Sequence, residues 1–218
     1  MRQKTTKKAE MPHISTLDKS YFRGTNAVNN LSLQNVTTDG DNGSSPRLDF
    51  GNKLYEDPYK KIYEIKAQFG SFEKKYYVSD SGCRSGVVLI KDDSILLVRQ
   101  YRLLIDGMSW EIPGGGVDAG ETPKDSAIRE CREETGILCK SLHSLIAYHP
   151  GLDTFCNPTY IYYCEDFEED NMAYKQNGET IENRWLYLND VLEMIYSMQI
   201  VDAFTIIGIF SCLHKRSL

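Results

Sequence analysis

Residues 115–137 form an acidic segment with clear signals for where a helix begins and ends. Thr122 followed by Pro123 predicts the start, because a hydroxyl side chain caps the first turn and proline suits the first helical position. Gly136 predicts the end, because glycine readily adopts the left-handed backbone of a helix C-cap. The segment therefore predicts a short helix of about three to four turns.

Three glutamates lie on one side of this predicted helix. At about 100° per residue, Glu130 and Glu134 stack one turn apart and Glu133 lies beside them. Carboxylates at this spacing repel each other, so a cation is expected to offset their charge. Arg129 can neutralise Glu133, four residues further on. The other two carboxylates favour hard divalent cations, whose preferred ligand is oxygen.

A run of glycines, Gly114, Gly115 and Gly116, comes just before the helix. Such a run leaves backbone amides and carbonyls uncovered, and a glycine loop leading into a helix commonly binds anions. The carboxylates, however, lie towards the C-terminal half of the helix, so metal ions would have to bridge the protein to a phosphate. The segment thus predicts a phosphate site that depends on cations. The alternative is a solvated acidic surface helix.

The spacing of these residues resembles the Nudix box, Gly-x5-Glu-x7-Arg-Glu-U-x-Glu-Glu-x-Gly-U, where U is a bulky aliphatic residue. The matching positions are Gly115, Glu121, Arg129, Glu130, Glu133, Glu134, Gly136 and Ile137. Cys131 stands at the first U position and is the one departure. Since cysteine is a small apolar core residue, we expect a slight effect on packing and none on the chemistry.

This resemblance implies an α/β protein with the Nudix fold, an α/β/α sandwich with a mixed sheet, for a Nudix hydrolase domain at residues 85–218. Ahead of it, within residues 51–84, apolar and polar residues alternate on both sides of Gly70-Ser71. That pattern predicts an N-terminal β-hairpin with a two-residue turn. Residues 1–50 are polar and poor in aliphatic residues, so we expect a disordered or loosely attached arm.

Three further strands are predicted after the box: residues 141–148, 159–164 and 183–188. The acidic stretch at residues 165–175 is predicted to be a solvated loop. Two helices follow, the first capped by Asn189 and Asp190 and the second by Asp202. The second helix is predicted to pack on the sheet through four residues: Phe204, Ile207, Phe210 and Ser211.

The resemblance also implies roles for individual residues in binding metal and moving protons. Three groups would hold two or three Mg²⁺ ions, which Mn²⁺ can replace: Glu130, Glu134 and the Gly114 carbonyl. Glu133 or Glu179 would take the proton of the attacking water. Glu179 best matches the glutamate that ADP-ribose pyrophosphatase relatives carry just before a strand, and Glu182 is the second candidate. The alternative for both is a surface acid on an acidic loop.

Residues 100–102 and 110–115 resemble the segment ahead of the box in nucleoside-diphosphate-sugar hydrolases. By that resemblance Arg102 contacts the diphosphate, Glu111 contacts substrate or metal, and Gly115 lies at the substrate. The alternative for Arg102 is a salt bridge at the end of a strand. The box residues with a structural role would be Glu121 and Arg129.

The implied reaction is Mg²⁺-dependent hydrolysis of the diphosphate bond of ADP-ribose or a related nucleoside diphosphate sugar. The products would be a nucleoside monophosphate and a sugar phosphate. One alternative is a hydrolase of another dinucleotide or of a nucleoside triphosphate. Another is a non-catalytic Nudix domain that senses a nucleotide sugar, although such domains usually lose box glutamates and this chain keeps them all.

The net charge of −6 argues against a general binder of nucleic acid or of an anionic membrane. There is no apolar run long enough to span a bilayer and no apolar segment typical of a signal peptide. The six cysteines include no CxxC pair, which favours reduced core residues and a cytoplasmic protein. In ADP-ribose pyrophosphatase relatives an N-terminal sheet packs across a homodimer, so the expected partners are a nucleotide sugar and a second copy of the chain.

Overall fold

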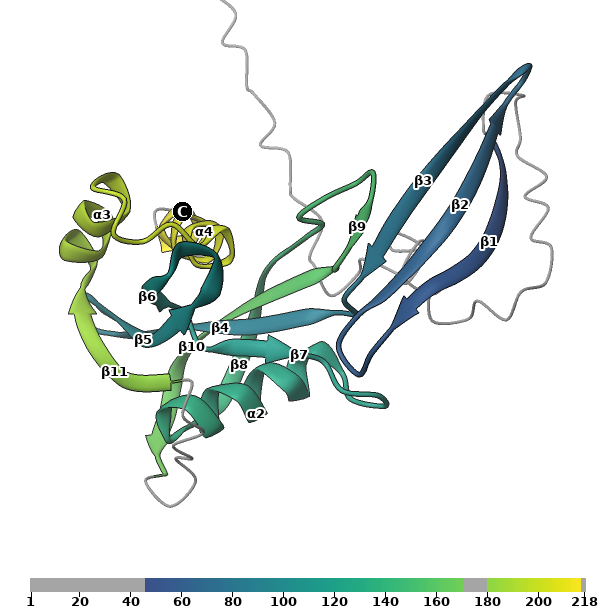
Figure 1. Ribbon diagram of the computed structural model, residues 1–218. Coiled ribbons are helices and arrows are strands. Elements are labelled where there is room, and N and C mark those ends of the chain that lie inside the picture. Colours follow the sequence, from purple (N-terminus) through teal and green to yellow (C-terminus); the bar gives the residue numbers. More distant parts are fainter. Residues whose placement is uncertain (1–45, 171–179, 217–218) are drawn as a thin grey trace, which may run out of the picture.

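The computed structural model describes residues 46–170 and 180–216, which form two β-sheets and three α-helices (Figure 1). The smaller sheet contains β1 (Arg47–Glu56), β2 (Lys61–Phe69), β3 (Phe72–Asp80) and β9 (Phe155–Cys156). The larger sheet contains β4 (Arg84–Lys91), β5 (Ser94–Arg102), β6 (Gly107–Glu111), β7 (Gly114–Gly116), β8 (Ile137–Tyr148), β10 (Thr159–Glu169) and β11 (Thr180–Tyr187). The helices are the 3₁₀ turn η2 (Leu103–Ile105), α2 (Pro123–Thr135), α3 (Leu188–Tyr196) and α4 (Ala203–Arg216).

The larger sheet is mixed. Its strand order is β11-β5-β4-β10-β8, with β6 paired to β5 and β7 paired to β4. The β10–β4 pair is parallel and the other pairs are antiparallel. β4 and β5 pair at only two positions beside their turn, after which each strand takes a short partner of its own. Beyond those two positions β4 and β5 separate, and the glycine run of β7 pairs with β4 while β6 pairs with β5.

Helices cover both faces of the larger sheet, with α2 on one side and α3 and α4 on the other (Figure 1). Successive residues of a strand point to opposite faces, so β4 supplies both layers. Val87 packs with Ala127 and Cys131 of α2, and Val88 packs with Phe204 of α4. Cys131 is fully buried, as expected for a core residue. This arrangement confirms the predicted α/β/α sandwich with a mixed sheet.

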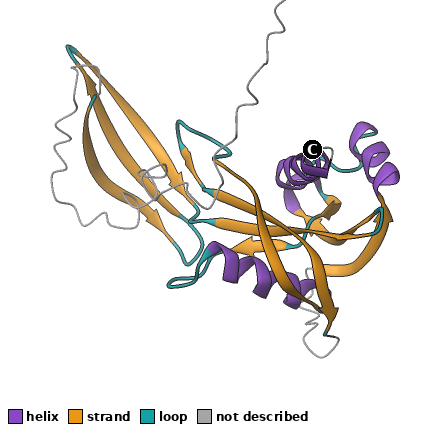
Figure 2. Cartoon of the chain, turned by 180° about the vertical axis from the view of Figure 1, so that it is seen from behind, coloured by secondary structure: helices purple, strands orange, loops and turns teal. Residues whose placement is uncertain are grey.

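The smaller sheet projects from the body of the molecule (Figures 1 and 2). Its β2–β3 hairpin is the predicted one, with Phe69 opposite Phe72 and Gly70 at a φ of 58°. β1 adds a strand to this hairpin and begins at Arg47, inside the range expected for a disordered or loosely attached arm. The rest of that range, residues 1–45, lies outside the described residues.

The prediction of a solvated loop at residues 165–175 is partly wrong. β10 continues to Glu169, because Phe167 stacks on Trp185 at a centroid distance of 5.5 Å and so belongs to the core on the α2 side. The acidic composition of residues 165–169 therefore did not indicate the strand, which Phe167 attaches to the core. Residues 171–175 of the expected loop lie outside the described residues.

The C-terminal helices differ from expectation in detail. Tyr187, not Asn189 or Asp190, is the N-cap of α3, and it makes no side-chain cap hydrogen bond. The predicted cap of α4 is confirmed, since Asp202 Oδ2 accepts from the Thr205 backbone N–H over 2.9 Å.

The face that α4 presents to the sheet is also rotated from the predicted one. Phe210 is 39% exposed, and the buried face consists of Phe204, Thr205, Gly208, Ile209 and Cys212. Gly208 explains the rotation, because a Cβ there would lie 3.1 Å from Ile112 Cδ1. The helix approaches the sheet most closely along that line.

All six cysteines are free thiols, which agrees with the absence of a disulfide framework. Within residues 46–170 and 180–216, no helix combines the length and apolar character needed to cross a bilayer.

Candidate active site

Helix α2 forms as predicted because its end signals are local. The Thr122 hydroxyl oxygen accepts from the Asp125 backbone N–H over 3.2 Å, and Pro123 is the first helical residue. At the other end, Gly136 adopts a φ of 70° and its N–H donates to the Arg132 carbonyl. The glutamates between these caps therefore hold a fixed orientation relative to the glycine run.

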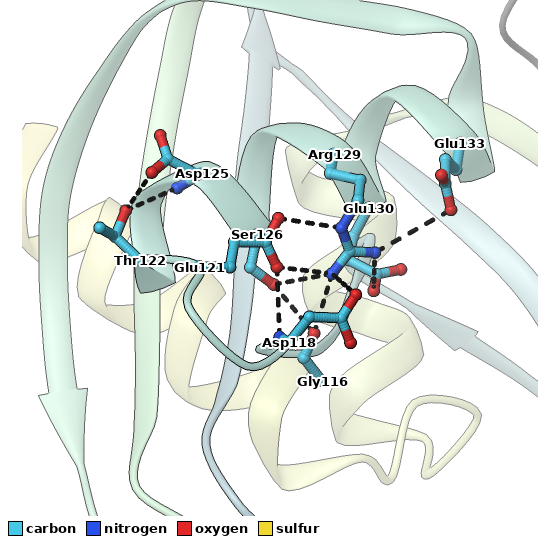
Figure 3. Close-up of polar contacts among 9 residues, drawn as sticks. All are labelled: Gly116, Asp118, Glu121, Thr122, Asp125, Ser126, Arg129, Glu130 and Glu133. Carbon is cyan, nitrogen blue, oxygen red and sulfur yellow. Dashed lines mark hydrogen bonds and ion pairs between the residues drawn. The ribbon is translucent and has the colours of Figure 1, made fainter.

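Arg129 lies at the centre of the polar contacts on α2 (Figure 3). Its guanidinium donates to both carboxylate oxygens of Glu121, over 3.0 and 2.9 Å, and to Glu130 Oε1 over 2.6 Å. It also donates to the Gly116 carbonyl over 3.1 Å. Glu133, the partner expected from helix spacing, is further away at 4.0 Å. Arg129 thus links the glycine run and Glu121 to helix α2.

Glu134 is the most deeply buried glutamate of the helix, with 7% of its surface exposed. Its Oε2 accepts from the backbone N–H of Gly114 over 2.9 Å. Burial raises the pKa of this carboxyl from 4.5 to about 7, against the lowering effect of the Gly114 hydrogen bond. Nearby Glu130 raises the pKa further and Arg102 lowers it. Without a cation, the ionised form of Glu134 is therefore costly near neutral pH.

Glu130 lies directly beneath Gly115. A Cβ at Gly115 would lie 2.6 Å from the Glu130 carboxyl carbon, closer than any real contact. Burial raises the pKa of Glu130, while its hydrogen bond with Arg129 lowers it. Gly114 is similarly confined, because a Cβ there would lie 2.4 Å from the Ser85 carbonyl oxygen. Glycine at position 115 therefore lets the backbone lie against the Glu130 carboxylate, and glycine at position 114 lets it lie against β4.

This donor set fits a hard divalent cation. Glu130 and Glu134 supply oxygen only, and both carboxyls would ionise more readily beside a positive charge. The described residues contain no group of three or more His, Cys, Asp or Glu side chains arranged to hold a metal. That is compatible with Mg²⁺, which is commonly bound by one or two carboxylates and takes its other ligands from water and substrate phosphate. The Gly114 carbonyl as a further ligand stays a prediction.

Arg102 and Glu111, the two predicted substrate contacts, form an ion pair with each other. Arg102 Nε and Nη2 donate to the two oxygens of Glu111 over 2.7 and 2.5 Å, and Glu111 is only 2% exposed. The salt bridge considered for Arg102 is therefore present in this structure. Both side chains are close enough to Glu134 to affect its pKa, so the pair borders the proposed metal site.

The two candidate proton acceptors that the structure describes, Glu133 and Glu182, lie on different elements. Glu133 lies on α2 with 36% of its side chain exposed, and its carboxylate lies 4.0 Å from Arg129 Nη1 (Figure 3). Glu182 lies on β11, where its carboxylate pairs with Arg99 over 3.4 Å and with Arg184 over 3.5 Å. Glu179 lies outside the described residues.

Two polar residues at this site were missed by the sequence analysis. The Ser126 hydroxyl donates to the Gly116 carbonyl over 3.0 Å and so helps Arg129 to hold the glycine run. Its position in the first turn of the helix, on the same face as Arg129 and Glu130, was an available signal. Arg84 Nη2 lies 3.7 Å from Glu111, and its guanidinium lies over the Phe204 ring at 4.1 Å. No local pattern marks that contact.

Comparison with known proteins identifies the family. The sequence matches the NUDIX domain profile over residues 83–202, which is more than half of the chain. The chain belongs to the NUDIX domain family. The family match, together with the similarity to an ADP-ribose pyrophosphatase described below, supports a Nudix pyrophosphohydrolase.

Two curated relatives show the range of similarity. A CMP-5'-(N-acetyl-N-hydroxy-3-aminopropyl)phosphonate hydrolase of Streptomyces rubellomurinus is 28% identical over 152 residues, which cover 70% of this chain and 73% of the relative. An ADP-ribose pyrophosphatase of Bacillus subtilis is 25% identical over 145 residues, covering 66% of this chain and 78% of the relative. Among solved structures, an ADP compounds hydrolase superposes with a TM-score of 0.69 at 17% identity, covering 78% of this chain and 93% of that one. The last comparison supports the fold.

Proposed function

We propose that this Nudix hydrolase splits the diphosphate bond of ADP-ribose or a related nucleoside diphosphate sugar in a Mg²⁺-dependent reaction. The products are a nucleoside monophosphate and a sugar phosphate. The observation that carries the proposal is the contact of Gly114 and Gly115 with the carboxylates of Glu134 and Glu130. It joins a bare backbone suited to phosphate with two carboxylates suited to a hard cation.

The reaction is a hydrolysis in which one oxygen–phosphorus bond forms and another breaks. A divalent cation, when bound, would supply positive charge to offset the diphosphate and to favour loss of a proton from water. The water oxygen joins one phosphorus, and the bridging oxygen leaves with the other phosphate. Glu130 and Glu134 would hold this cation, and Arg129 fixes the positions of Glu130 and the Gly116 carbonyl through hydrogen bonds to both.

Glu133 and Glu179 are the proposed acceptors of the proton that the attacking water releases. Glu133 lies on the same helix face as the metal-binding candidates and is part-exposed, so a water can reach it. For Glu179 the support is its resemblance to the glutamate of related enzymes.

Arg102 is the proposed contact for the diphosphate, although it pairs with Glu111 in this structure. Glu111 has two other polar neighbours, Arg84 at 3.7 Å and Gln100 at 3.4 Å. If Arg102 turns towards a phosphate, Glu111 is not left as a buried charge without a counterpart. The exchange is therefore less costly than breaking an isolated buried ion pair.

A homodimer is also proposed, on the basis of the projecting smaller sheet. Several large apolar side chains of β1, β2 and β3 are exposed on this sheet, and such exposed apolar surface is typical of a protein–protein interface. Exposed fractions run from 39 to 56% for Leu48, Leu54, Tyr55, Phe69, Phe72 and Tyr77. A second copy of the chain could cover them, and light scattering on the purified protein measures the assembly directly.

Phosphate release from a panel of substrates tests the function. The purified protein is incubated with Mg²⁺ and ADP-ribose, other nucleotide sugars, dinucleotides or nucleoside triphosphates, and the products are separated. We expect the highest kcat/KM with ADP-ribose or another nucleotide sugar. Faster turnover of triphosphates or dinucleotides would favour the alternative hydrolase, and tight nucleotide-sugar binding without products would favour a sensor.

A further inference from the structure

Ser85 carries a hydroxyl group that the rest of the fold does not explain. Its side chain is fully buried, and among the described residues Ser85 Oγ is the one buried side-chain oxygen or nitrogen without a hydrogen-bond partner. Native proteins contain few such groups, because a buried hydroxyl that loses water gains nothing in return. The next residue on the same face of β4 is Val87, so an apolar residue would suit the packing better.

Strand pairing places Ser85 beside Glu130. Ser85 lies directly opposite Gly115 in the antiparallel β4–β7 pair. Opposite residues point to the same face of the sheet, with Cβ positions about 4.5–5.5 Å apart. The missing Cβ of Gly115 points at the Glu130 carboxyl group, 2.6 Å away. The Ser85 side chain therefore points towards α2, next to that carboxylate.

A hydrated cation beside Glu130 would supply the hydrogen-bond partner that the Ser85 hydroxyl lacks. Mg²⁺ keeps several waters when it binds a protein, and those waters need hydrogen-bond acceptors in a buried site. We propose that Ser85 is a positioning residue whose hydroxyl hydrogen-bonds a water brought in by the cation beside Glu130. The inference rests on the proposed function, since it needs a divalent cation at Glu130 and Glu134.

Cation affinity and stability together test this role. Mn²⁺ binding is measured by titration calorimetry on the full-length protein, and Tm is measured in EDTA, for wild type, Ser85→Ala and Ser85→Cys. In EDTA we expect the Ser85→Ala Tm to equal that of wild type or to exceed it by up to about 4 °C, because the hydroxyl has no counterpart there. We expect Mn²⁺ binding to weaken by about tenfold or more, as is usual when a group behind a metal ligand is lost.

Ser85→Cys and a control variant, Ser141→Ala, separate the effect of the hydroxyl from that of packing. Ser85→Cys keeps the side-chain shape with a slightly larger atom that hydrogen-bonds water poorly, so we expect it to weaken Mn²⁺ binding as Ser85→Ala does. Ser141→Ala removes a hydroxyl from β8, where Ser141 contacts His143 over 3.1 Å, and is expected to leave Mn²⁺ affinity unchanged.

Three results would overturn the inference. Wild-type Mn²⁺ affinity in Ser85→Ala would remove the role of Ser85 and leave the proposed function standing. A Tm in EDTA that falls by several degrees in both Ser85 variants would show that the hydroxyl is already satisfied without a cation. Wild-type protein that binds no Mn²⁺ would defeat both the inference and the proposed metal site.

Discussion

The backbone N–H of Gly114 donates to Glu134 Oε2 over 2.9 Å, which ties the glycine run to the last turn of helix α2. Twenty residues separate the two in the chain, and the contact depends on both the β4–β7 pairing and the caps of the helix. It brings a bare stretch of backbone to a buried carboxylate. The proposed chemistry depends on that proximity.

Glu134→Gln should lower kcat at least about a hundredfold, because a carboxylate on a catalytic cation contributes several kcal/mol. Glutamine can still accept from Gly114, so the variant should stay folded with a normal circular dichroism spectrum. Lys124→Gln, an exposed change on the same helix, is the matched control and should retain full turnover. Near-normal kcat in Glu134→Gln would refute its assignment as a ligand.

In the absence of a cation, the stability of the protein should fall as pH rises, because Glu134 ionises. Its pKa is raised from 4.5 to about 7 in the folded protein, so the protonated form favours folding. This contribution is present below pH 4.5 and is lost as pH rises towards 7. Between pH 5 and 8 in EDTA, the free energy of unfolding of wild type should fall by about 2–3 kcal/mol more than that of Glu134→Gln. Denaturant melts of both proteins measure the difference, and parallel pH profiles would contradict it.

Gly115→Ala should weaken cation binding and lower turnover by about tenfold or more. Its new Cβ would lie 2.6 Å from the Glu130 carboxyl carbon, and small displacements of catalytic groups are costly. Gly116→Ala is the matched control, because a Cβ there meets nothing within 4 Å. Kinetics of both variants at several Mg²⁺ concentrations test this, and equal behaviour of the two would show that the Gly115–Glu130 contact is unimportant.

Arg129→Lys should destabilise the protein by about 1.5–3 kcal/mol, since lysine cannot reproduce the two hydrogen bonds to Glu121. The comparison is Arg132→Lys on the exposed side of the helix. Arg132 also pairs with a carboxylate, Asp170, but on the surface, where such a pair contributes about 0–1 kcal/mol. Urea melts rank the two variants. A larger loss of stability in Arg132→Lys would contradict the central role of Arg129 in these contacts.

The parts of the fold that were predictable are those with local causes. Thr122, Pro123 and Gly136 define α2 through contacts a few residues apart. The hairpin at Gly70 follows from a two-residue turn between alternating strands. The rotation of α4 about Gly208 was not predictable, because Gly208 meets β4 and Ile112, which are distant in the sequence.

The candidate site was only partly predictable for the same reason. The box spacing places Glu130 and Glu134 together without any knowledge of the sheet. The Arg102–Glu111 pair depends on how β5 turns through η2 into β6, a register that residue types alone do not determine. Ser85 was overlooked because one serine in an apolar strand looks ordinary until its pairing with Gly115 is known.

The most direct measurement follows ADP-ribose after metal removal. The protein is stripped with EDTA, transferred to chelator-free buffer, and assayed for AMP and sugar phosphate before and after Mg²⁺ is added, with Glu134→Gln in parallel. We predict no products from the stripped protein, restoration by Mg²⁺ in wild type, and little restoration in the variant. Undiminished hydrolysis by exhaustively stripped protein, or full restoration in Glu134→Gln, would contradict a cation held by these glutamates.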